Sequence, residues 1–273
     1  MEAITSRQNS KIKLANKLVS KRQREKEGLF LIDYARDLER ALAYSYTVEF
    51  AFYCEALASD DDRNLADNID SERLFAIDAD LMEKASYRQN PSGLVAVIQQ
   101  KDVLTLHDMD DIDKKPILAL VDLRKPGNIG ALLRTADASG IETICLIDTA
   151  LDIYNPNIIR ASTGAVFKGN IYQASTNDIF TFFDQHDIRI VAAHLDGQQS
   201  LYDLDFTSER TAIVLGTEDT GLDDIWVNRC DALVKIPMMG QIADSLNVSV
   251  SGAIFMYEAL RQRQSKQLGQ HNG

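Results

Sequence analysis

The chain has 273 residues, a length that allows one large domain or two ordinary ones, and its hydrophobic content of 45% is normal for a globular protein. Its formal net charge of −12 argues against a polyanionic partner for the molecule as a whole. The sequence contains no apolar run of about 18 residues, which excludes a transmembrane helix.

The first hundred residues predict a small α/β unit. Asn9 or Ser10 can cap a helix over residues 11–27, and Gly28 can end it. A second helix is expected over residues 33–44. Strands, identified by β-branched and aromatic residues, are expected at residues 29–32, 47–54, 73–77 and 94–98.

The N-terminal helix is basic although the chain is acidic. Residues 1–28 carry eight basic side chains and three acidic ones, and acidic residues gather elsewhere, at 60–62 and 108–113. A local basic patch on an acidic protein can still bind nucleic acid, whereas the alternative is a solvated surface helix. The candidate RNA-binding residues are Arg7, Lys11, Lys13, Lys17, Lys21 and Arg22.

The second half of the chain predicts a mostly parallel sheet. Residues 101–115 are charged and poorly patterned, and after Pro116 apolar strands alternate with helices, as in a sheet covered on both faces. We therefore predict an RNA substrate-binding domain at 1–105, a linker at 106–115 and a second domain at 116–273. Strands are expected at 117–121, 143–147, 170–173, 189–193, 211–215 and 232–236, and helices at 129–138, 158–166, 176–186, 223–227 and 248–264.

The chain has neither a secretory pattern nor a metal-binding pattern. Its N-terminus is polar and basic, without an apolar segment. Cys54, Cys145 and Cys230 are scattered and odd in number, which suits a reducing cytosol. The four histidines show no ligand spacing. We expect a cytoplasmic protein without a metal and without a membrane partner.

A first chemistry-bearing loop lies at residues 122–136, after the strand at 117–121. Gly127 and Gly130 could permit a tight turn from strand to helix, and Asn128 sits where a helix cap would be. Arg134 follows Gly130 at i+4 and so projects from the same face of the helix. It could hold a phosphate there, or it could be an ordinary surface arginine. The G-x-G-x-x-G spacing of a dinucleotide site is absent.

A second loop, at residues 216–221, places Gly216 and Gly221 on either side of Glu218. The glycines would let the backbone approach a ligand, and Glu218 can accept hydrogen bonds from hydroxyls or amides. A plain acidic turn is the alternative.

A third loop, at residues 236–247, is the most informative segment. Pro237 stops a strand, and Ser245 and Asn247 stand at the start of a helix, where backbone N–H groups are free. The loop lacks Lys and His, which excludes Walker chemistry and a His-based triad. Three polar loops at strand ends predict a ligand site of an open α/β sheet.

Together these loops resemble the motifs of the SpoU (TrmH) branch of the SPOUT RNA methyltransferases. N-x-G-x-x-x-R-x-A at 128–136 is similar to the first family motif, and G-x-E-x-x-G at 216–221 to the second. IPM at 236–238 with SLN at 245–247 is similar to the third, and residues 160–165 also resemble a family segment. The likeness covers about residues 117–262.

The N-terminal half is similar to the ribosomal-protein-like RNA-binding domain that many family members carry. Residues 4–8 and 27–32 match its start. The chain departs from the pattern at Asp33 and Tyr34, where such domains usually have Glu-Gly, and this bears on the geometry of the RNA contact.

The resemblance implies a trefoil-knotted C-terminal domain with a mostly parallel sheet, joined to a smaller N-terminal α/β domain. It also implies an obligate homodimer whose active sites are completed across the interface, and S-adenosyl-L-methionine as the cofactor. The residues that would bind the cofactor are Leu215, Gly216, Gly221, Ile236, Met238 and Leu246.

The family view makes Arg134 the residue that activates a ribose 2′-hydroxyl. A free arginine is a poor base, because its pKa exceeds about 12. We therefore expect Arg134 to orient a phosphate and stabilise the developing alkoxide. Asn128 and Ser245 would position the ribose or Arg134, and Glu218 and Asn247 would hold the geometry of the site.

The leading hypothesis is 2′-O-methylation of ribosomal RNA, with transfer RNA as the second substrate class, because an appended N-terminal domain favours ribosomal RNA. One alternative is a catalytically silent RNA-binding or ribosome-assembly protein on the same fold, against which the intact Arg134, Glu218, Ser245 and Asn247 argue. A nucleotide-dependent oxidoreductase is the other, and the missing dinucleotide fingerprint argues against it.

Overall fold

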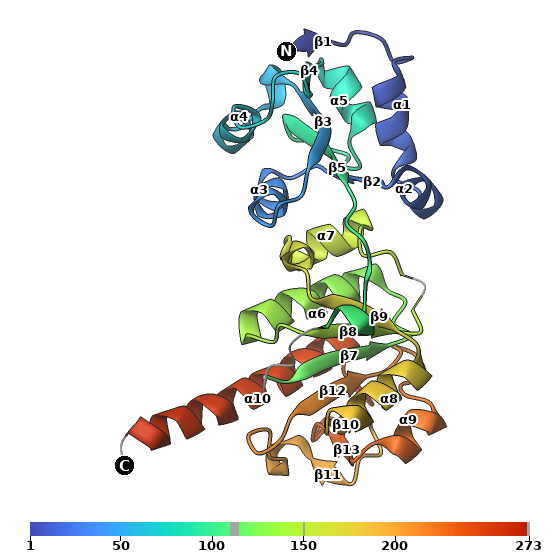
Figure 1. Cartoon of the computed structure of the whole chain (residues 1–273), viewed down its shortest axis with the longest axis vertical. Helices are drawn as coiled ribbons and strands as arrows, with labels where there is room; N and C mark the ends of the chain where they lie inside the picture. Colours follow the sequence, from blue (N-terminus) through green and yellow to red (C-terminus); the bar gives the residue numbers. More distant parts are fainter. Residues whose placement is uncertain (110–114, 150, 272–273) are drawn as a thin grey trace. The chain divides into compact units, whose positions relative to one another are not determined.

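The computed structural model describes residues 1–109, 115–149 and 151–271. Contacts divide the chain into an N-terminal unit, Met1–Asp102 with Asp152–Gly169, and a C-terminal unit, Val103–Leu151 with Asn170–Gly273 (Figure 1). Residues 110–114 of the predicted linker lie outside the described residues. The domain limits drawn from the sequence stay a prediction.

The sheet of the N-terminal unit is mixed. Among the described residues its strand order is β1-β4-β3-β5-β2, with β5 antiparallel to β2 and β3 and the other pairs parallel. Phe52, Val95 and Val97 are fully buried in the core beneath α1 and α5. The strands are β1 (Glu2–Ala3), β2 (Leu29–Ile32), β3 (Val48–Tyr53), β4 (Leu74–Ala76) and β5 (Leu94–Gln99), and the helices are α1 (Ser10–Lys17), α2 (Lys21–Glu27), α3 (Ala35–Ala43), η1 (Glu55–Leu57), α4 (Asp60–Ala66) and α5 (Ala79–Ala85).

The single helix predicted over residues 11–27 is wrong, because α1 and α2 are separate helices. Arg24 is buried, and its Nη1 donates hydrogen bonds to the carbonyls of Leu18 (2.8 Å) and Val19 (2.7 Å). These carbonyls lie at the break, so Arg24 satisfies groups that would otherwise be buried without a partner. The ends are as predicted: Asn9 caps α1, and Gly28 ends α2 at a φ of 64°.

Helices α4 and α5 were not predicted from the sequence. Ser59 and Asp62 form a capping box at the start of α4, and Asp78 accepts a hydrogen bond from Leu81 N at the start of α5. The acidic run at 60–62 is therefore the first turn of a helix, where carboxylates are favourable. Each helix has seven residues, too few turns to give a clear hydrophobic period.

The segment Asp152–Gly169 carries α7 (Pro156–Ser162) and η3 (Ala165–Lys168). Its Tyr154 ring stacks on Phe30 at 4.5 Å between centroids, and its Phe167 ring meets Tyr46 edge-on at 5.2 Å. The Asp152 carboxylate accepts a hydrogen bond from Arg24 Nε at 2.6 Å. An aromatic cluster and a buried ion pair thus fix this segment within the N-terminal unit.

The sheet of the C-terminal unit is parallel, as predicted. Among the described residues its order is β11-β13-β10-β12-β7-β8-β9-β6, and each pair is parallel. Strands β7 and β12 are buried along their whole length, as expected for the centre of a covered sheet. The strands are β6 (Leu104–Thr105), β7 (Ile117–Val121), β8 (Ile144–Ile147), β9 (Ile171–Ala174), β10 (Arg189–Ala193), β11 (Gln199–Ser200), β12 (Thr211–Leu215) and β13 (Ala232–Lys235).

Helices cover both faces of this sheet (Figure 1). Phe183 of α8 and Trp226 of α9 pack on one face, whereas α6 and α10 contact each other over the other face. None of the helices in the described part of the chain is long and apolar enough to cross a membrane. The helices of this unit are η2 (Leu106–Asp108), α6 (Pro126–Ser139), α8 (Thr176–Gln185), η4 (Leu201–Asp203), α9 (Asp224–Arg229) and α10 (Val248–His271).

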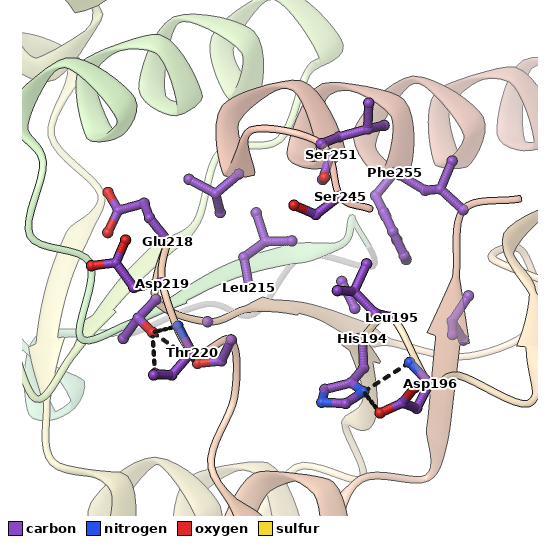
Figure 2. A pocket seen from close by; sticks show the side chains of 18 of the residues that line it. His194, Leu195, Asp196, Leu215, Glu218, Asp219, Thr220, Ser245, Ser251 and Phe255 are labelled. Atoms are coloured by element: carbon purple, nitrogen blue, oxygen red, sulfur yellow. Dashed lines mark hydrogen bonds and ion pairs between the residues drawn. The ribbon is translucent and has the colours of Figure 1, made fainter. Parts of the chain in front are cut away.

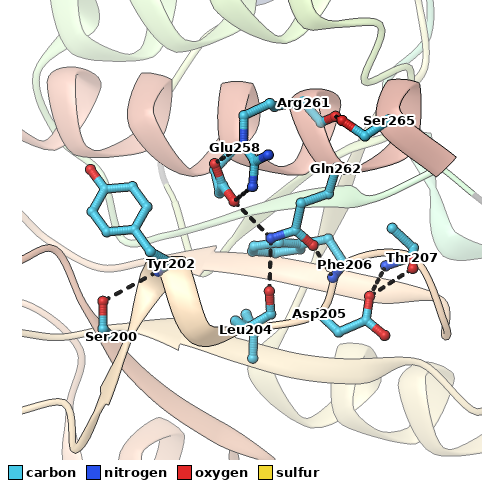
Figure 3. Close-up of polar contacts among 10 residues, drawn as sticks. All are labelled: Ser200, Tyr202, Leu204, Asp205, Phe206, Thr207, Glu258, Arg261, Gln262 and Ser265. Carbon is cyan, nitrogen blue, oxygen red and sulfur yellow. Dashed lines mark hydrogen bonds and ion pairs between the residues drawn. The ribbon is translucent and has the colours of Figure 1, made fainter. Parts of the chain in front are cut away.

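Polar side chains hold α10 to the segment before β12 (Figure 3). Gln262 Nε2 donates to the Leu204 carbonyl (2.8 Å), and Gln262 Oε1 accepts from Phe206 N (3.0 Å). Glu258 also accepts from Gln262 and from Arg261, and the Arg261 hydrogen bonds hold the pKa of Glu258 below its usual range. These contacts fix the helix whose first turn borders the predicted site.

Candidate active site

A cavity of about 410 Å³ lies at the carboxyl ends of β10, β12 and β13 (Figure 2). Its walls come from the loop after β10, the loop 216–221, the end of β13 and the first turns of α10. The volume falls within the range of about 300–1,000 Å³ that is usual for small-molecule sites. The ligand position predicted at this edge of the sheet therefore lies at a cavity of the structure.

The candidate cofactor residues gather at this cavity. All of them line it: Leu215, Gly216, Gly221, Ile236, Met238 and Leu246. Their lining positions offer backbone groups and apolar side chains rather than charges. Their role in holding a cofactor stays a prediction.

The glycines of the second loop shape the chain itself. A Cβ at Gly216 would lie 2.4 Å from the Gly221 backbone, and Gly221 adopts a φ of 70°. Between them, the backbone groups of Thr217 and Gly221 exchange hydrogen bonds of 3.0 and 3.1 Å. The loop thus folds back on itself at the edge of the cavity.

Helix α6 corrects the interpretation of the first loop. It begins at Pro126 with Lys125 as its N-cap, so Asn128 lies inside the first turn and is not the cap. Gly127 and Gly130 do not have positive φ angles, and the expected tight glycine turn is wrong. A proline at the first helical position explains the earlier start, because its fixed φ suits a helix and its missing N–H is not needed there.

Hydrogen bonds join the three predicted motifs. Asn128 Nδ2 donates to Glu218 Oε1 at 2.9 Å, and Asn247 Nδ2 donates to Asn128 Oδ1 at 3.2 Å. Glu218 Oε1 also accepts from Lys125 N at 3.2 Å, at the positive end of α6. A polar chain therefore runs from α10 through α6 to the loop after β12.

Asn247 and Ser245 lie where α10 begins. Asn247 Oδ1 accepts from Ser249 N at 2.9 Å, which is the side-chain cap expected at this helix start. Ser245 lines the cavity on the same side as Ser251 and Phe255 (Figure 2). The third loop thus serves both the polar chain and the cavity wall.

Arg134 is not at the cavity of its own chain. It is exposed on α6 and lies outside the cavity lining. Within the described ranges it makes no hydrogen bond or ion pair. The structure therefore brings Asn128, Glu218 and Asn247 into contact but leaves Arg134 apart from them.

Sequence reasoning missed the loop after β10, which contributes His194, Leu195 and Asp196 to the cavity. His194 Nδ1 accepts a hydrogen bond from Asp196 N at 3.1 Å. No Lys or Arg from the described ranges lines the cavity, whereas Asp196, Glu218 and Asp219 do. The available signal was positional, because carboxyl ends of neighbouring parallel strands meet at one edge.

The RNA-binding candidates lie in the N-terminal unit. Lys11 Nζ lies 4.8 Å from the ring centroids of both Phe50 and Phe75, and Arg7 pairs with Asp80 at 3.6 Å. Arg24 belongs to the basic stretch but is buried and cannot contact RNA. The remaining candidates are exposed: Lys13, Lys17, Lys21 and Arg22.

The described residues contain no group of three or more His, Cys, Asp or Glu side chains that could hold a metal ion.

Both halves of the chain match known protein families. Residues 115–257 match the SpoU rRNA Methylase family, and residues 9–96 match the MRM3-like substrate binding domain. The 23S rRNA (uridine(2479)-2'-O)-methyltransferase of Streptomyces viridochromogenes is 30% identical over 95% of this chain and 92% of its own length.

Solved structures are similar over nearly the whole chain. A crystal structure of an RNA 2'-O ribose methyltransferase has a TM-score of 0.86 at 36% identity, covering 96% of this chain and 99% of its own. The SpoU methyltransferase AviRb from Streptomyces viridochromogenes, in complex with AdoMet, has a TM-score of 0.82 at 26% identity. The match covers 94% of this chain and 99% of the AviRb chain.

Proposed function

Because the chain belongs to the SpoU rRNA methylase family, we propose that it transfers the methyl group of S-adenosyl-L-methionine to a ribose 2′-hydroxyl of RNA. The observation that carries this proposal is the hydrogen-bonded chain Asn247–Asn128–Glu218 beside the 410 Å³ cavity. Ribosomal RNA is the leading substrate, and transfer RNA is the second.

The residues of the cavity suit the cofactor. Backbone groups and apolar side chains around Leu215, Ile236 and Leu246 fit an adenine ring and a methionine chain. Asp196 and Asp219 place negative charge on a wall without Lys or Arg in the described ranges, which suits a cationic ligand. When bound, S-adenosyl-L-methionine supplies a methyl group on a positively charged sulfur.

Arg134 acts on the RNA. A 2′-hydroxyl is a weak nucleophile until its proton begins to leave, and methyl transfer needs its oxygen held in line with the methyl group. The planar guanidinium can bind a neighbouring phosphate with two hydrogen bonds and stabilise negative charge on the 2′-oxygen. The exposure of Arg134 leaves it available for that contact.

Asn128, Glu218 and Asn247 keep the elements of the site in place. Glu218 accepts hydrogen bonds from Lys125, the N-cap of α6, and from Asn128 in its first turn, and so ties the start of this helix to the loop after β12. Asn247 ties the start of α10 to the same point. Ser245 lines the cavity wall, which supports a role in positioning the ribose or Arg134.

A homodimer would complete the site. Arg134 lies away from the cavity of its own chain, so the partner's Arg134 is the one that reaches it. Apolar side chains exposed near the site support such an interface: Met239 is 93% and Ile242 94% exposed, and Val250 and Tyr257 of α10 are about half exposed. The proposal also includes a trefoil knot formed by the chain from residue 215 to α10. It further includes a cytoplasmic location.

The test is methylation by the purified protein. Radiolabelled S-adenosyl-L-methionine is incubated with unmodified 23S rRNA and, separately, with bulk tRNA, and the position of 2′-O-methylation is mapped. We expect label on one ribose of the rRNA. Label on tRNA alone would indicate that transfer RNA, and not ribosomal RNA, is the substrate. Cofactor binding without label on either RNA would indicate the silent RNA-binding protein instead.

A further inference from the structure

The N-terminal unit carries a Tyr–Arg stack outside the basic stretch of α1 and α2. The Arg88 guanidinium lies 4.0 Å from the centre of the Tyr34 ring. Ser86 Oγ accepts from Arg88 N at 2.9 Å and donates to Asp33 Oδ2 at 3.1 Å. The loop after α5 is therefore fastened to the end of β2, and the stack is held in one geometry.

Tyr87, the residue before Arg88, contacts α7 (Pro156–Ser162). Its side chain is 37% exposed, and its hydroxyl accepts a hydrogen bond from Asn157 Nδ2 at 3.2 Å. Asn157 Oδ1 in turn accepts from Arg160 Nη2 at 3.0 Å, and Arg160 is exposed. Residues from two distant parts of the sequence thus form one continuous surface within this unit.

The acidic groups near this surface are buried, whereas two of its basic groups are exposed. Asp33 and Asp37 are buried, and burial raises the pKa of both carboxyls. Arg36 is exposed and pairs with Asp37, and Arg160 is exposed as well. Tyr87 and Arg160 are thus exposed and Tyr34 and Arg88 are half-buried, while the carboxyl groups of Asp33 and Asp37 are buried.

We propose that Tyr34, Tyr87, Arg88 and Arg160 form a stacking surface for unpaired nucleotides of the RNA substrate. Sequence-specific proteins hold unpaired RNA bases against aromatic rings and guanidinium planes, and arginines bind the adjoining phosphates. The hydrogen bonds of Ser86 and Asn157 fix the groups beforehand, which reduces the ordering that binding requires.

This inference rests on the proposed function and adds a division of roles to it. The lysines of α1 and α2 can contact phosphates of any sequence, whereas the stacking surface requires bases that are not paired. The RNA target would therefore present a loop or bulge to the N-terminal unit.

The test compares Tyr87 variants of the full chain for binding to unmodified 23S rRNA and to the same RNA annealed to complementary DNA. Tyr87→Leu removes the ring and should weaken binding to the single-stranded form about tenfold. Tyr87→Phe keeps the ring and loses only the hydrogen bond from Asn157, so it should lose much less RNA affinity than Tyr87→Leu. Tyr44, which is 42% exposed, follows the last residue of α3, whereas Tyr34 precedes the first. It supplies the matched control Tyr44→Leu, which should leave RNA affinity unchanged.

Salt and kinetics distinguish stacking from a general loss of charge or of fold. The salt dependence of Tyr87→Leu binding should match the wild type, because no charge is removed, whereas Arg88→Gln should reduce the slope. Methyl transfer by Tyr87→Leu should show a raised KM for RNA with an unchanged kcat, and its thermal unfolding should match that of Tyr44→Leu.

Equal RNA affinity of Tyr87→Leu and the wild type would overturn the inference, and so would an equal loss in Tyr87→Phe. Neither result touches the proposed function, provided that the wild type still methylates the RNA. A wild type that binds cofactor but methylates no RNA would contradict the proposed function instead, while the comparison of RNA affinities would still decide the stacking surface.

Discussion

Asn128 donates a hydrogen bond to Glu218 over 2.9 Å, although the two residues are 90 positions apart in the sequence. The contact joins the first turn of α6 to the loop after β12. Asn128 uses both ends of its amide, because its oxygen accepts from Asn247. An amide suits this position because it donates and accepts through two separate atoms, whereas an ionised carboxylate of similar shape can only accept.

Asn128→Asp should therefore reduce methyl-transfer activity more than Asn128→Ala does. The new carboxylate would face Glu218 without a proton to donate, and two carboxylates at hydrogen-bond distance repel each other. We expect Asn128→Asp to lower kcat by about a hundredfold or more, as is typical when a preorganised polar site is disrupted. Initial rates on saturating RNA provide the measurement. Wild-type activity of Asn128→Asp would argue that the contact with Glu218 has no part in the site.

Arg134→Ala should abolish methyl transfer while leaving cofactor affinity nearly unchanged. Arg134 does not line the cavity, so its removal takes nothing from the residues that surround the cofactor. Removing a group that stabilises charge in the transition state lowers the rate by about a hundredfold or more. Calorimetric titration with S-adenosyl-L-methionine measures the cofactor affinity, and single-turnover rates measure methyl transfer. Arg134→Lys should also fail, because lysine lacks the planar fork; wild-type turnover by either variant would remove Arg134 from the mechanism.

Exposed cations of α1 and α2 should supply the salt-dependent part of RNA binding. Replacing Lys13, Lys17, Lys21 and Arg22 together with glutamine should weaken binding. It should also reduce the salt slope by about 0.7–0.9 for each phosphate that the variant no longer neutralises. The control Lys26→Gln removes a charge of α2, the one on Lys26, which pairs with Glu27 at 3.2 Å. Filter binding between low and moderate salt gives the slopes; parallel slopes for wild type and quadruple variant would place the phosphate-binding groups elsewhere.

Point variants are preferable to removing the N-terminal residues. The segment Asp152–Gly169 packs its Tyr154 and Phe167 rings against Phe30 and Tyr46. A truncated chain would expose these rings to water, and a loss of activity would then report damage to packing as well as weaker RNA binding.

Much of the C-terminal unit could be predicted from its sequence. Buried parallel strands are continuous apolar runs, and the motifs after β7, β12 and β13 stand at one edge of the sheet for that reason. The loop after β10 was missed because His194 and Asp196 form no recognisable motif. The bonds from Asn128 to Glu218 and Asn247 were beyond prediction, since they depend on side-chain placement across three elements.

The N-terminal unit was harder to predict because local patterns there are overridden by distant partners. Residues 11–27 are helical by pattern, but Arg24 ends up buried against the carbonyls of Leu18 and Val19 and against Asp152. A buried arginine with a partner 128 positions away leaves no local signal. The sequence therefore shows Arg24 only as one of the eight basic side chains of residues 1–28.

The Arg24–Asp152 pair should contribute strongly to stability. Both side chains are nearly inaccessible, and removing one partner leaves an uncompensated buried charge, which costs about 3–5 kcal/mol. Asp152→Ala should therefore lower the midpoint of thermal unfolding markedly. The exposed pair of Lys21 and Glu25 gives the control, because Glu25→Ala should change the midpoint little. A double variant Arg24→Met with Asp152→Ala should lose less than the sum of the single losses; strict additivity would mean that the two groups do not interact.

The last prediction concerns the shared site of the proposed dimer. If each cavity uses the partner's Arg134, an Arg134→Ala chain paired with an Asn247→Ala chain places both defects in one site and leaves the other intact. Random pairing at equal amounts makes half of the dimers mixed, so activity should rise to about a quarter of the wild-type value. Each variant alone should remain inactive, and sedimentation should show a species of about twice 30.5 kDa. If Arg134 served the cavity of its own chain, every site in the mixture would carry one defect and no activity would return. Full activity at a concentration where the protein sediments as a monomer would contradict the dimer itself.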